Sequence, residues 1–97
     1  MNTYVIRRRT AWKTPAELEA AAARSARVGN EEMPDQVRWI RSYVVQEANG
    51  TLGTVCIYQA VSPAAIRDHA QRVGMPADEI TPVARTVVVR EDPTEAA

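Results

Sequence analysis

Two short motifs of one kind, Thr14-Pro15 and Ser62-Pro63, constrain the fold of this chain more than any other feature of its sequence. A hydroxyl side chain at a helix start accepts a hydrogen bond from an amide of the first turn. Proline is favoured at the first helical position because it has no amide to leave unpaired. Glu17 also follows Thr14 at the spacing of a capping box. Each motif therefore predicts the start of a helix, and the rest of the chain is arranged around two helices.

The segments around these helices have strand character. Gly29 and Gly74 follow the two helical patterns, where a left-handed residue commonly closes a helix. Asn49-Gly50 is the strongest short-range signal of a hairpin with a two-residue turn. The predicted strands are residues 3–9, 37–48, 52–60 and 82–89. The order β-α-β-β-α-β predicts an α+β, ferredoxin-like fold, with an antiparallel sheet and two helices on one face.

A chain of 97 residues is long enough for one hydrophobic core and too short for two. We expect a single ferredoxin-like domain over residues 1–89 and a flexible C-terminal tail over residues 90–97. No apolar stretch reaches the roughly 20 residues that a membrane-spanning helix needs. The N-terminus also lacks the apolar run of a secretory signal, so the expected location is cytoplasmic, with no membrane partner.

The charges are balanced, with twelve basic and twelve acidic side chains. A chain without net charge has no strong field to attract a nucleic acid, so we expect no nucleic-acid partner. The one dense basic run is Arg7-Arg8-Arg9, at the end of a predicted strand. Strand alternation sends Arg8 to one face and its neighbours to the other, which favours a solvated strand edge over a phosphate site.

The turn at Asn49-Gly50 sets the predicted register of the central hairpin, with Tyr43 opposite Cys56 and Arg41 opposite Tyr58. One face is then nearly all aliphatic and packs under the helices, while the other has no cover from its own chain. The uncovered face is predicted to carry Trp39, Arg41, Tyr43, Val45, Thr54, Cys56 and Tyr58. Such a surface favours a homodimer, with a ligand or ion site there as the alternative. A register error of one residue would exchange the faces.

His69 is the only histidine, and its spacing with Ile66, Ala70 and Val73 places it on or beside the buried stripe of the second helix. A hydrogen-bonded core histidine is the commoner role, and a ligand or general-base role is the alternative. Cys56 is the only cysteine, which excludes an internal disulfide. In mid-strand a free cysteine usually behaves as a small apolar residue. No hydrolase or NTPase motif is present.

Several segments, taken in order, resemble a known family. They are residues 39–44, 55–60, Ser62-Pro63, 67–70 and 73–83. Together they are similar to the small actinobacterial nickel-binding ferredoxin-like proteins and the uncharacterised domains grouped with them, over roughly residues 4–83. The resemblance implies a dimeric ferredoxin-like fold and, for some members, nickel binding without an assigned reaction. His69, Tyr43, Cys56 and Tyr58 fall on positions of the family's pattern.

These observations leave three hypotheses for function. The first is a homodimeric, non-enzymatic binding protein for nickel or a similar divalent metal, with the metal on His69 and on carboxylate, water or partner-chain ligands. The second is an enzyme or small-molecule sensor of the dimeric α+β barrel type. It would use a cavity between sheet and helices, with His69 as acid or base and Tyr43 or Tyr58 as hydrogen-bond donors. The third is a plain protein-interaction module.

Overall fold

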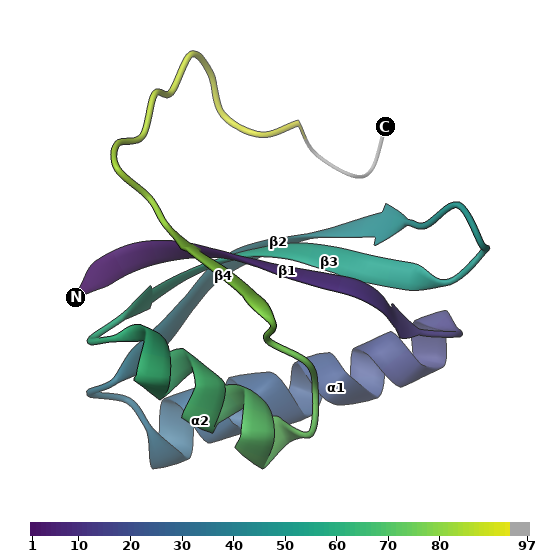
Figure 1. The fold of residues 1–97 in the computed structure, drawn as a ribbon, viewed down its shortest axis with the longest axis horizontal. Coiled ribbons are helices and arrows are strands. Elements are labelled where there is room, and N and C mark those ends of the chain that lie inside the picture. The colour runs from purple at the N-terminus through teal and green to yellow at the C-terminus, as the bar shows by residue number, and fades with distance from the viewer. Residues whose placement is uncertain (94–97) are drawn as a thin grey trace.

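The structure, a computed structural model, describes residues 1–93 of the 97. The elements are β1 (Asn2–Trp12), α1 (Pro15–Arg27), a π-helical turn η1 (Val28–Glu32), β2 (Val37–Gln46), β3 (Leu52–Ala60), α2 (Pro63–Val73) and β4 (Glu79–Pro82). The sheet is antiparallel with strand order β2-β3-β1-β4. Both helices cover the same face of it (Figure 1). This arrangement is the predicted ferredoxin-like α+β fold. The end of the predicted tail, residues 94–97, lies outside the described part.

Both helices begin where their capping motifs predict. The Thr14 hydroxyl accepts a hydrogen bond from the Glu17 amide at 3.2 Å, and the Glu17 carboxylate accepts one from the Lys13 amide at 2.7 Å. The Ser62 hydroxyl accepts from the amide three residues on at 3.1 Å. At the other end of α2, Gly74 adopts φ 85°, the left-handed conformation expected of a glycine cap. Local hydrogen bonding therefore sets these three boundaries.

The prediction that the first helix ends at Gly29 is wrong. α1 continues directly into η1, and Gly29 lies inside that turn without a positive φ. The extra turn brings Val28 and Met33 into the core, where each is about 1–2% exposed. Gly29 instead faces His69, since a Cβ at this position would lie 3.5 Å from the imidazole Nε2. Burial of two more apolar side chains thus extends the helix past its expected stop.

The central hairpin turns through three residues rather than two. The Glu47 amide donates to the Thr51 carbonyl at 2.9 Å, and the Gly50 amide donates to the Glu47 carbonyl at 3.1 Å. Gly50 has φ +87°, as in the loop that combines a type I turn with a left-handed glycine. The longer loop shifts the register by one residue. Tyr43 therefore lies opposite Val55, not opposite Cys56 as predicted.

This shift exchanges the faces of β3. Cys56 and Tyr58 lie under the helices and are 4% and 2% exposed, so their predicted place on the open face is wrong. The pairing of β2 is also irregular between Trp39 and Arg41. As a result Trp39 lies opposite Tyr58 and on the helix-covered face, so its predicted place on the open face is wrong as well. Arg41 and Tyr43 keep their predicted place on the open face. A strand's side chains alternate with period two, so a slip of one residue reverses the orientation of each.

The last strand lies earlier in the chain than predicted. β4 ends at Pro82, and the Val83 amide donates to the Thr3 carbonyl at 2.9 Å before the chain leaves the sheet. Pro82 is tolerated because β4 is an edge strand. The valines at 87–89, predicted to form the strand, are 73–82% exposed and belong to a segment that arches above the open face (Figure 1). Ile80 supplies the apolar contact with the core instead.

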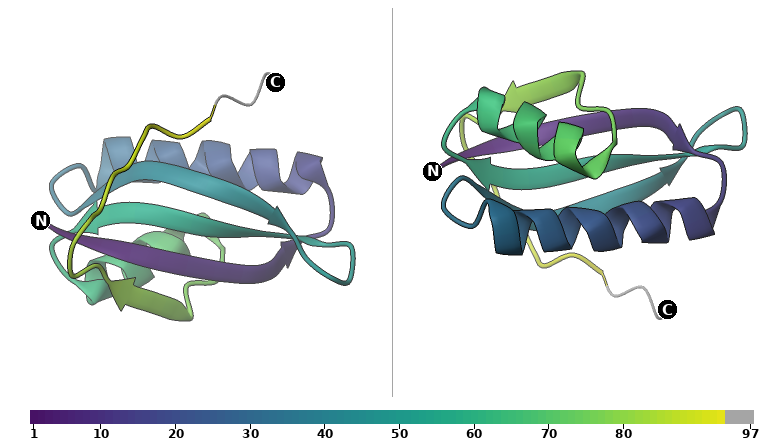
Figure 2. Two further views of the ribbon diagram at one scale, coloured as in Figure 1. Left: turned by 90° about the horizontal axis from the view of Figure 1, so that it is seen from above. Right: turned by 90° about the horizontal axis from the view of Figure 1, so that it is seen from below.

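The core fills the space between the sheet and the two helices. α1 runs along the β2 side of the sheet and α2 along the side of β1 and β4 (Figure 2). Within the part of the chain that the structure describes, neither helix has the length and apolar character needed to cross a bilayer. The side chains at the centre of the core are Tyr4, Ile6, Val28, Met33, Val37, Cys56, Tyr58, Ala60, Ala65, Ile66 and Val73.

Candidate functional site

A cavity lies between α1 and the sheet, beside the edge strand β2. Its volume is about 420 Å³, within the range of sites that hold small molecules. Trp39, Ile40 and Val44, three large apolar side chains of β2 that stay 38–53% exposed, are among its lining residues. We call this space the helix–sheet cavity. Its other lining residues are Arg8, Trp12, Leu18, Glu19, Ala21, Ala22, Ser25, Arg41, Ser42, Thr54, Cys56, Tyr58 and Met75.

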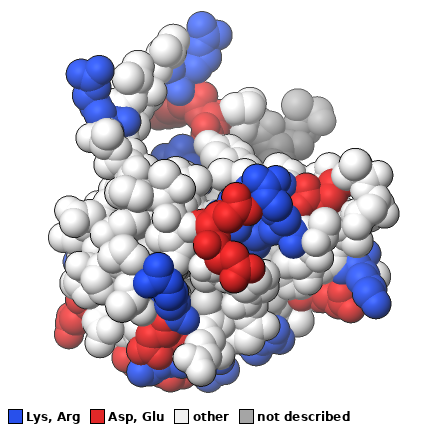
Figure 3. Space-filling model, viewed as in Figure 1, with Lys and Arg blue, Asp and Glu red and all other residues white. Residues whose placement is uncertain are grey.

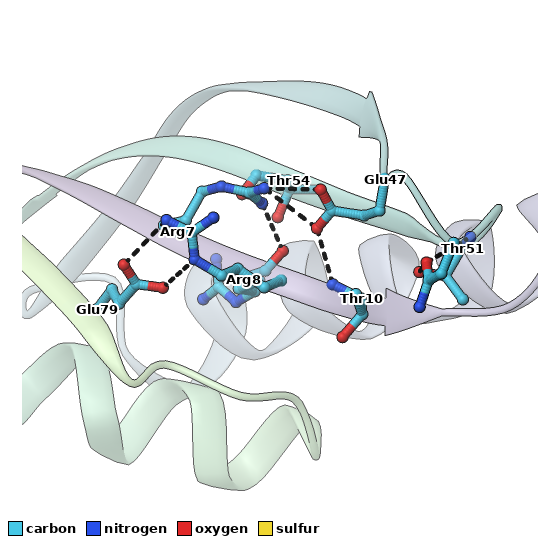
Figure 4. A network of polar contacts seen from close by, with 9 residues as sticks. Arg7, Arg8, Thr10, Glu47, Thr51, Thr54 and Glu79 are labelled. Carbon is cyan, nitrogen blue, oxygen red and sulfur yellow. Dashed lines mark hydrogen bonds and ion pairs between the residues drawn. The ribbon is translucent and has the colours of Figure 1, made fainter.

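The basic run of β1 alternates as predicted, and its outer members are paired. Arg7 binds the Glu47 carboxylate with Nη2 at 2.8 Å (Figure 4). Arg9 binds Glu79 with Nε at 2.7 Å. Gly53 lets the first pair cross the sheet, because a Cβ there would lie 2.5 Å from the Glu47 carboxylate. Basic and acidic side chains also lie mixed over the surface in Figure 3, with no large area of one sign. The outer arginines are therefore structural ion pairs.

Arg8 differs from its neighbours, because it is buried. Only 1% of the residue is exposed, and its guanidinium carbon lies 5.7 Å from the centre of the Tyr58 ring. Among residues 1–93, its Nε and Nη2 atoms have no hydrogen-bond partner. Tyr4 and Ile6, at alternate positions before it, are core residues on the same face. This alternation was the available signal for a buried Arg8, so the predicted solvated edge is wrong for this residue.

A chain of hydrogen bonds runs along the sheet wall of the cavity. The Trp39 indole donates to the Ser42 hydroxyl at 2.7 Å, Ser42 donates to the Cys56 sulfur at 3.0 Å, and Cys56 donates to the Thr54 hydroxyl at 3.2 Å. An indole N–H can only donate, so the Ser42 oxygen is the acceptor of the first bond. The thiol of Cys56 is thus a link between two hydroxyl groups.

Ser25 of α1 joins Tyr58 and His69. Its hydroxyl lies 2.9 Å from the Tyr58 hydroxyl, and its carbonyl lies 3.1 Å from His69 Nε2. A carbonyl only accepts, so Nε2 carries the proton and Nδ1 is left as a buried acceptor without a partner in the described chain. Burial raises the pKa of Tyr58 to about 12. Burial also lowers the pKa of His69, while the Ser25 carbonyl acts in the opposite direction. Both rings are therefore uncharged at neutral pH.

The surroundings of His69 do not fit a nickel ion within one chain. Over residues 1–93, no group of three or more His, Cys, Asp and Glu side chains comes together. The imidazole Nδ1 is one potential metal ligand, and it belongs to a side chain that is 1% exposed. Besides burial, the charges of Arg8 and Arg72 lower the pKa of the imidazole, and they would also repel a bound cation. The negative charge of Asp68 raises this pKa and would attract a cation. A metal on His69 would need further ligands that residues 1–93 of one chain do not bring to it.

The other two predicted site residues lie on the opposite face of the sheet. The Arg41 guanidinium and the Tyr43 hydroxyl both donate to the same oxygen of Asp92, at 2.6 Å and 2.7 Å. These bonds hold the C-terminal segment over the open face. The predicted set is therefore divided: Trp39, Cys56 and Tyr58 line the helix–sheet cavity with their side chains under the helices, and Tyr43 lies outside it. Arg41 borders the cavity, but its guanidinium bonds to Asp92 over the open face.

Comparisons with known proteins agree with this fold. The chain matches the family described as nickel responsive protein SCO4226-like over residues 4–83. The crystal structure of SCO4226 from Streptomyces coelicolor A3(2) is similar, with a TM-score of 0.70 and 22% sequence identity over 88% of this chain and 99% of that chain. At this identity the likeness concerns the fold. No curated protein matches the chain. Because the family match spans most of the sequence, this chain belongs to the nickel-responsive SCO4226-like family.

Proposed function

We propose that this protein binds a small organic ligand in the helix–sheet cavity and catalyses no reaction of its own. The observation that carries the proposal is the cavity itself, about 420 Å³ of space with a mainly apolar lining and one buried cation. His69 is not among the lining residues, so an acid–base role on a bound substrate has no support from its position. Tyr58 lines the cavity, but its hydroxyl is engaged with Ser25.

Filling the cavity from the helix side should block binding. Ala22 lines the cavity and is half-buried, whereas the next residue, Ala23, is exposed. We expect Ala22→Phe to weaken the binding of 2-naphthoate or its neutral amide at least tenfold, because the added ring occupies the ligand's space. Ala23→Phe is the matched control and should bind as the wild type does. Isothermal titration calorimetry measures both, and equal affinity in the two variants would place the probe outside the cavity.

We further propose that the protein is a homodimer through the open face of the sheet. Val5, Val55 and Ile57 lie half-buried on that face, and neither helix of residues 1–93 packs against them. Residues 85–92 pass above the face and leave a space of about 890 Å³ beneath them. The exposed valines at 87–89 add apolar surface to the same region. A second copy would cover both surfaces at once.

A negative charge on the open face should separate the dimer. Tyr43→Asp would place a carboxylate beside Asp92 and in the apolar contact between two copies, where an unpaired charge is costly to bury. We expect this variant to be monomeric at micromolar concentration in light scattering, while Gln71→Asp on the exposed side of α2 leaves the mass unchanged. A monomeric wild-type protein would contradict the proposed interface.

Nickel binding is the second candidate function, and the family's description is the observation that favours it. One chain does not supply a set of nickel ligands over its described residues. Under this candidate, His69 would contribute Nδ1, and a second copy or solvent would supply the remaining ligands. A nickel effect on this protein should therefore depend on His69.

A further inference from the structure

Resting on the proposed function, we propose that the ligand of the helix–sheet cavity is an organic carboxylate. Arg8 and Thr54 would bind its anionic group, and its apolar body would lie against Trp39 and the apolar side chains of α1. The inference comes from two donors on the cavity wall that have no acceptor within the described chain.

The first donor is the Arg8 guanidinium. Arginine stays charged in proteins, and a buried charge is normally paired because its removal from water is costly. Arg8 is 1% exposed, yet its Nε and Nη2 atoms have no partner in residues 1–93. The one carboxylate among the lining residues belongs to Glu19, which is exposed and forms no ion pair with Arg8. A bound anion would supply the missing partner.

The second donor is the Thr54 hydroxyl. Thr54 lies directly opposite Arg8 in the β1–β3 pair, so the two side chains stand next to each other on the helix face. The hydrogen-bond chain that begins at the Trp39 indole ends on the Thr54 oxygen, which accepts from Cys56. Within residues 1–93 the Thr54 hydroxyl accepts this bond and donates none, so its proton can be donated into the cavity. A guanidinium and a hydroxyl side by side match the two oxygens of a carboxylate.

The balance of charge favours a carboxylate over a phosphate. One buried guanidinium compensates one negative charge, whereas a phosphomonoester carries about −1.5 to −2 at neutral pH. The two serine hydroxyls on the wall are already engaged, since Ser42 donates to Cys56 and Ser25 bonds to Tyr58. The rest of the lining is largely apolar, which suits an uncharged organic body.

The test compares 2-naphthoate with 2-naphthamide, two probes of one shape that differ in charge. We expect the wild-type protein to bind the carboxylate about 30-fold more tightly than the amide in isothermal titration calorimetry. Arg8→Met should abolish this preference while still binding the amide, and Thr54→Val should reduce it about fivefold. Glu19→Gln tests whether the lining carboxylate compensates Arg8; if it does not, the affinity for 2-naphthoate changes less than twofold. Inorganic phosphate should not compete.

The possible results separate the inference from the function on which it rests. If the wild-type protein binds both probes with equal affinity and Ala22→Phe blocks both, the proposal of a carboxylate ligand is wrong, but the cavity is still a binding site. If Glu19→Gln binds 2-naphthoate ten times more tightly than the wild type, Glu19 is the partner of Arg8, and the proposal of a carboxylate ligand is again wrong. If neither probe binds the wild-type protein, the proposed function fails as well. Thr54→Val is nearly isosteric, so it keeps the test decisive even where Arg8→Met does not fold.

Discussion

Replacing Arg8 with methionine is expected to make the ligand-free protein more stable, with a melting temperature higher by about 10 °C. Two nitrogens of the buried guanidinium, Nε and Nη2, have no hydrogen-bond partner in the described chain, and methionine fills similar space without a charge. Replacing buried ionic groups with apolar ones stabilises proteins by about 1–4 kcal/mol in measured cases. About 2 kcal/mol corresponds to roughly 10 °C for a domain of this size. Differential scanning calorimetry without ligand measures the change.

Arg7→Met is the matched control for this experiment. Arg7 is the preceding residue on the same strand, but its guanidinium makes two hydrogen bonds to the Glu47 carboxylate. Its removal leaves the partly buried Glu47 carboxylate with the hydrogen bond from the Thr10 amide alone, so we expect a loss of about 1 kcal/mol. A destabilised Arg8→Met protein would mean that the charge of Arg8 is compensated in the free protein. A gain in stability on loss of a side chain is typical of residues retained for binding.

The second large effect is expected at His69. His69→Ala removes a buried ring and its hydrogen bond to the Ser25 carbonyl, and should lower the free energy of unfolding by about 3 kcal/mol at pH 7.5. Because burial lowers the pKa of His69, the folded protein keeps the ring neutral while the unfolded chain takes up a proton below about pH 6.5. The contribution of His69 is therefore complete above that pH and declines as the pH falls. Urea unfolding at several pH values measures it.

The difference between wild type and His69→Ala should narrow below pH 6.5, by at most about 1.4 kcal/mol per pH unit. A difference that widens on acidification would mean that the imidazole is protonated in the folded protein. The same pair of proteins tests nickel. If nickel binds through Nδ1, it should raise the melting temperature of the wild type and not of His69→Ala, with the effect declining as the ring is protonated. Equal melting shifts in both proteins would place the ion elsewhere.

The stability changes expected for Arg8→Met and His69→Ala both arise from side chains buried between α1 and the sheet. Arg8 and His69 both lie next to Tyr58, with the guanidinium carbon 5.7 Å and the imidazole centre 5.6 Å from the centre of its ring. The charge of Arg8 also contributes to the lowered pKa of His69. We therefore expect an anion bound at Arg8 to raise that pKa, because it would neutralise a nearby positive charge.

The sequence by itself determined the features that depend on neighbouring residues. Thr14 and Ser62 set the helix starts through hydrogen bonds that span three residues, and Gly74 ends α2 through its own backbone conformation. The alternation of Arg7 and Arg8 follows from the pleat of a strand. The order of these local elements was sufficient for the ferredoxin-like fold, because few arrangements bury both helices against one antiparallel sheet.

Only the tertiary structure decided which side chains meet under the helices. A turn of two residues and a turn of three are both compatible with Asn49-Gly50, and the choice between them moved Cys56 and Tyr58 from the open face into the core. The sequence alone also could not predict that Nε and Nη2 of Arg8 lack a hydrogen-bond partner, because this depends on residues of α1, β2 and β3 that are distant in sequence. Register and burial are settled by the packing of whole elements, whose summed contacts outweigh the preference of any one turn.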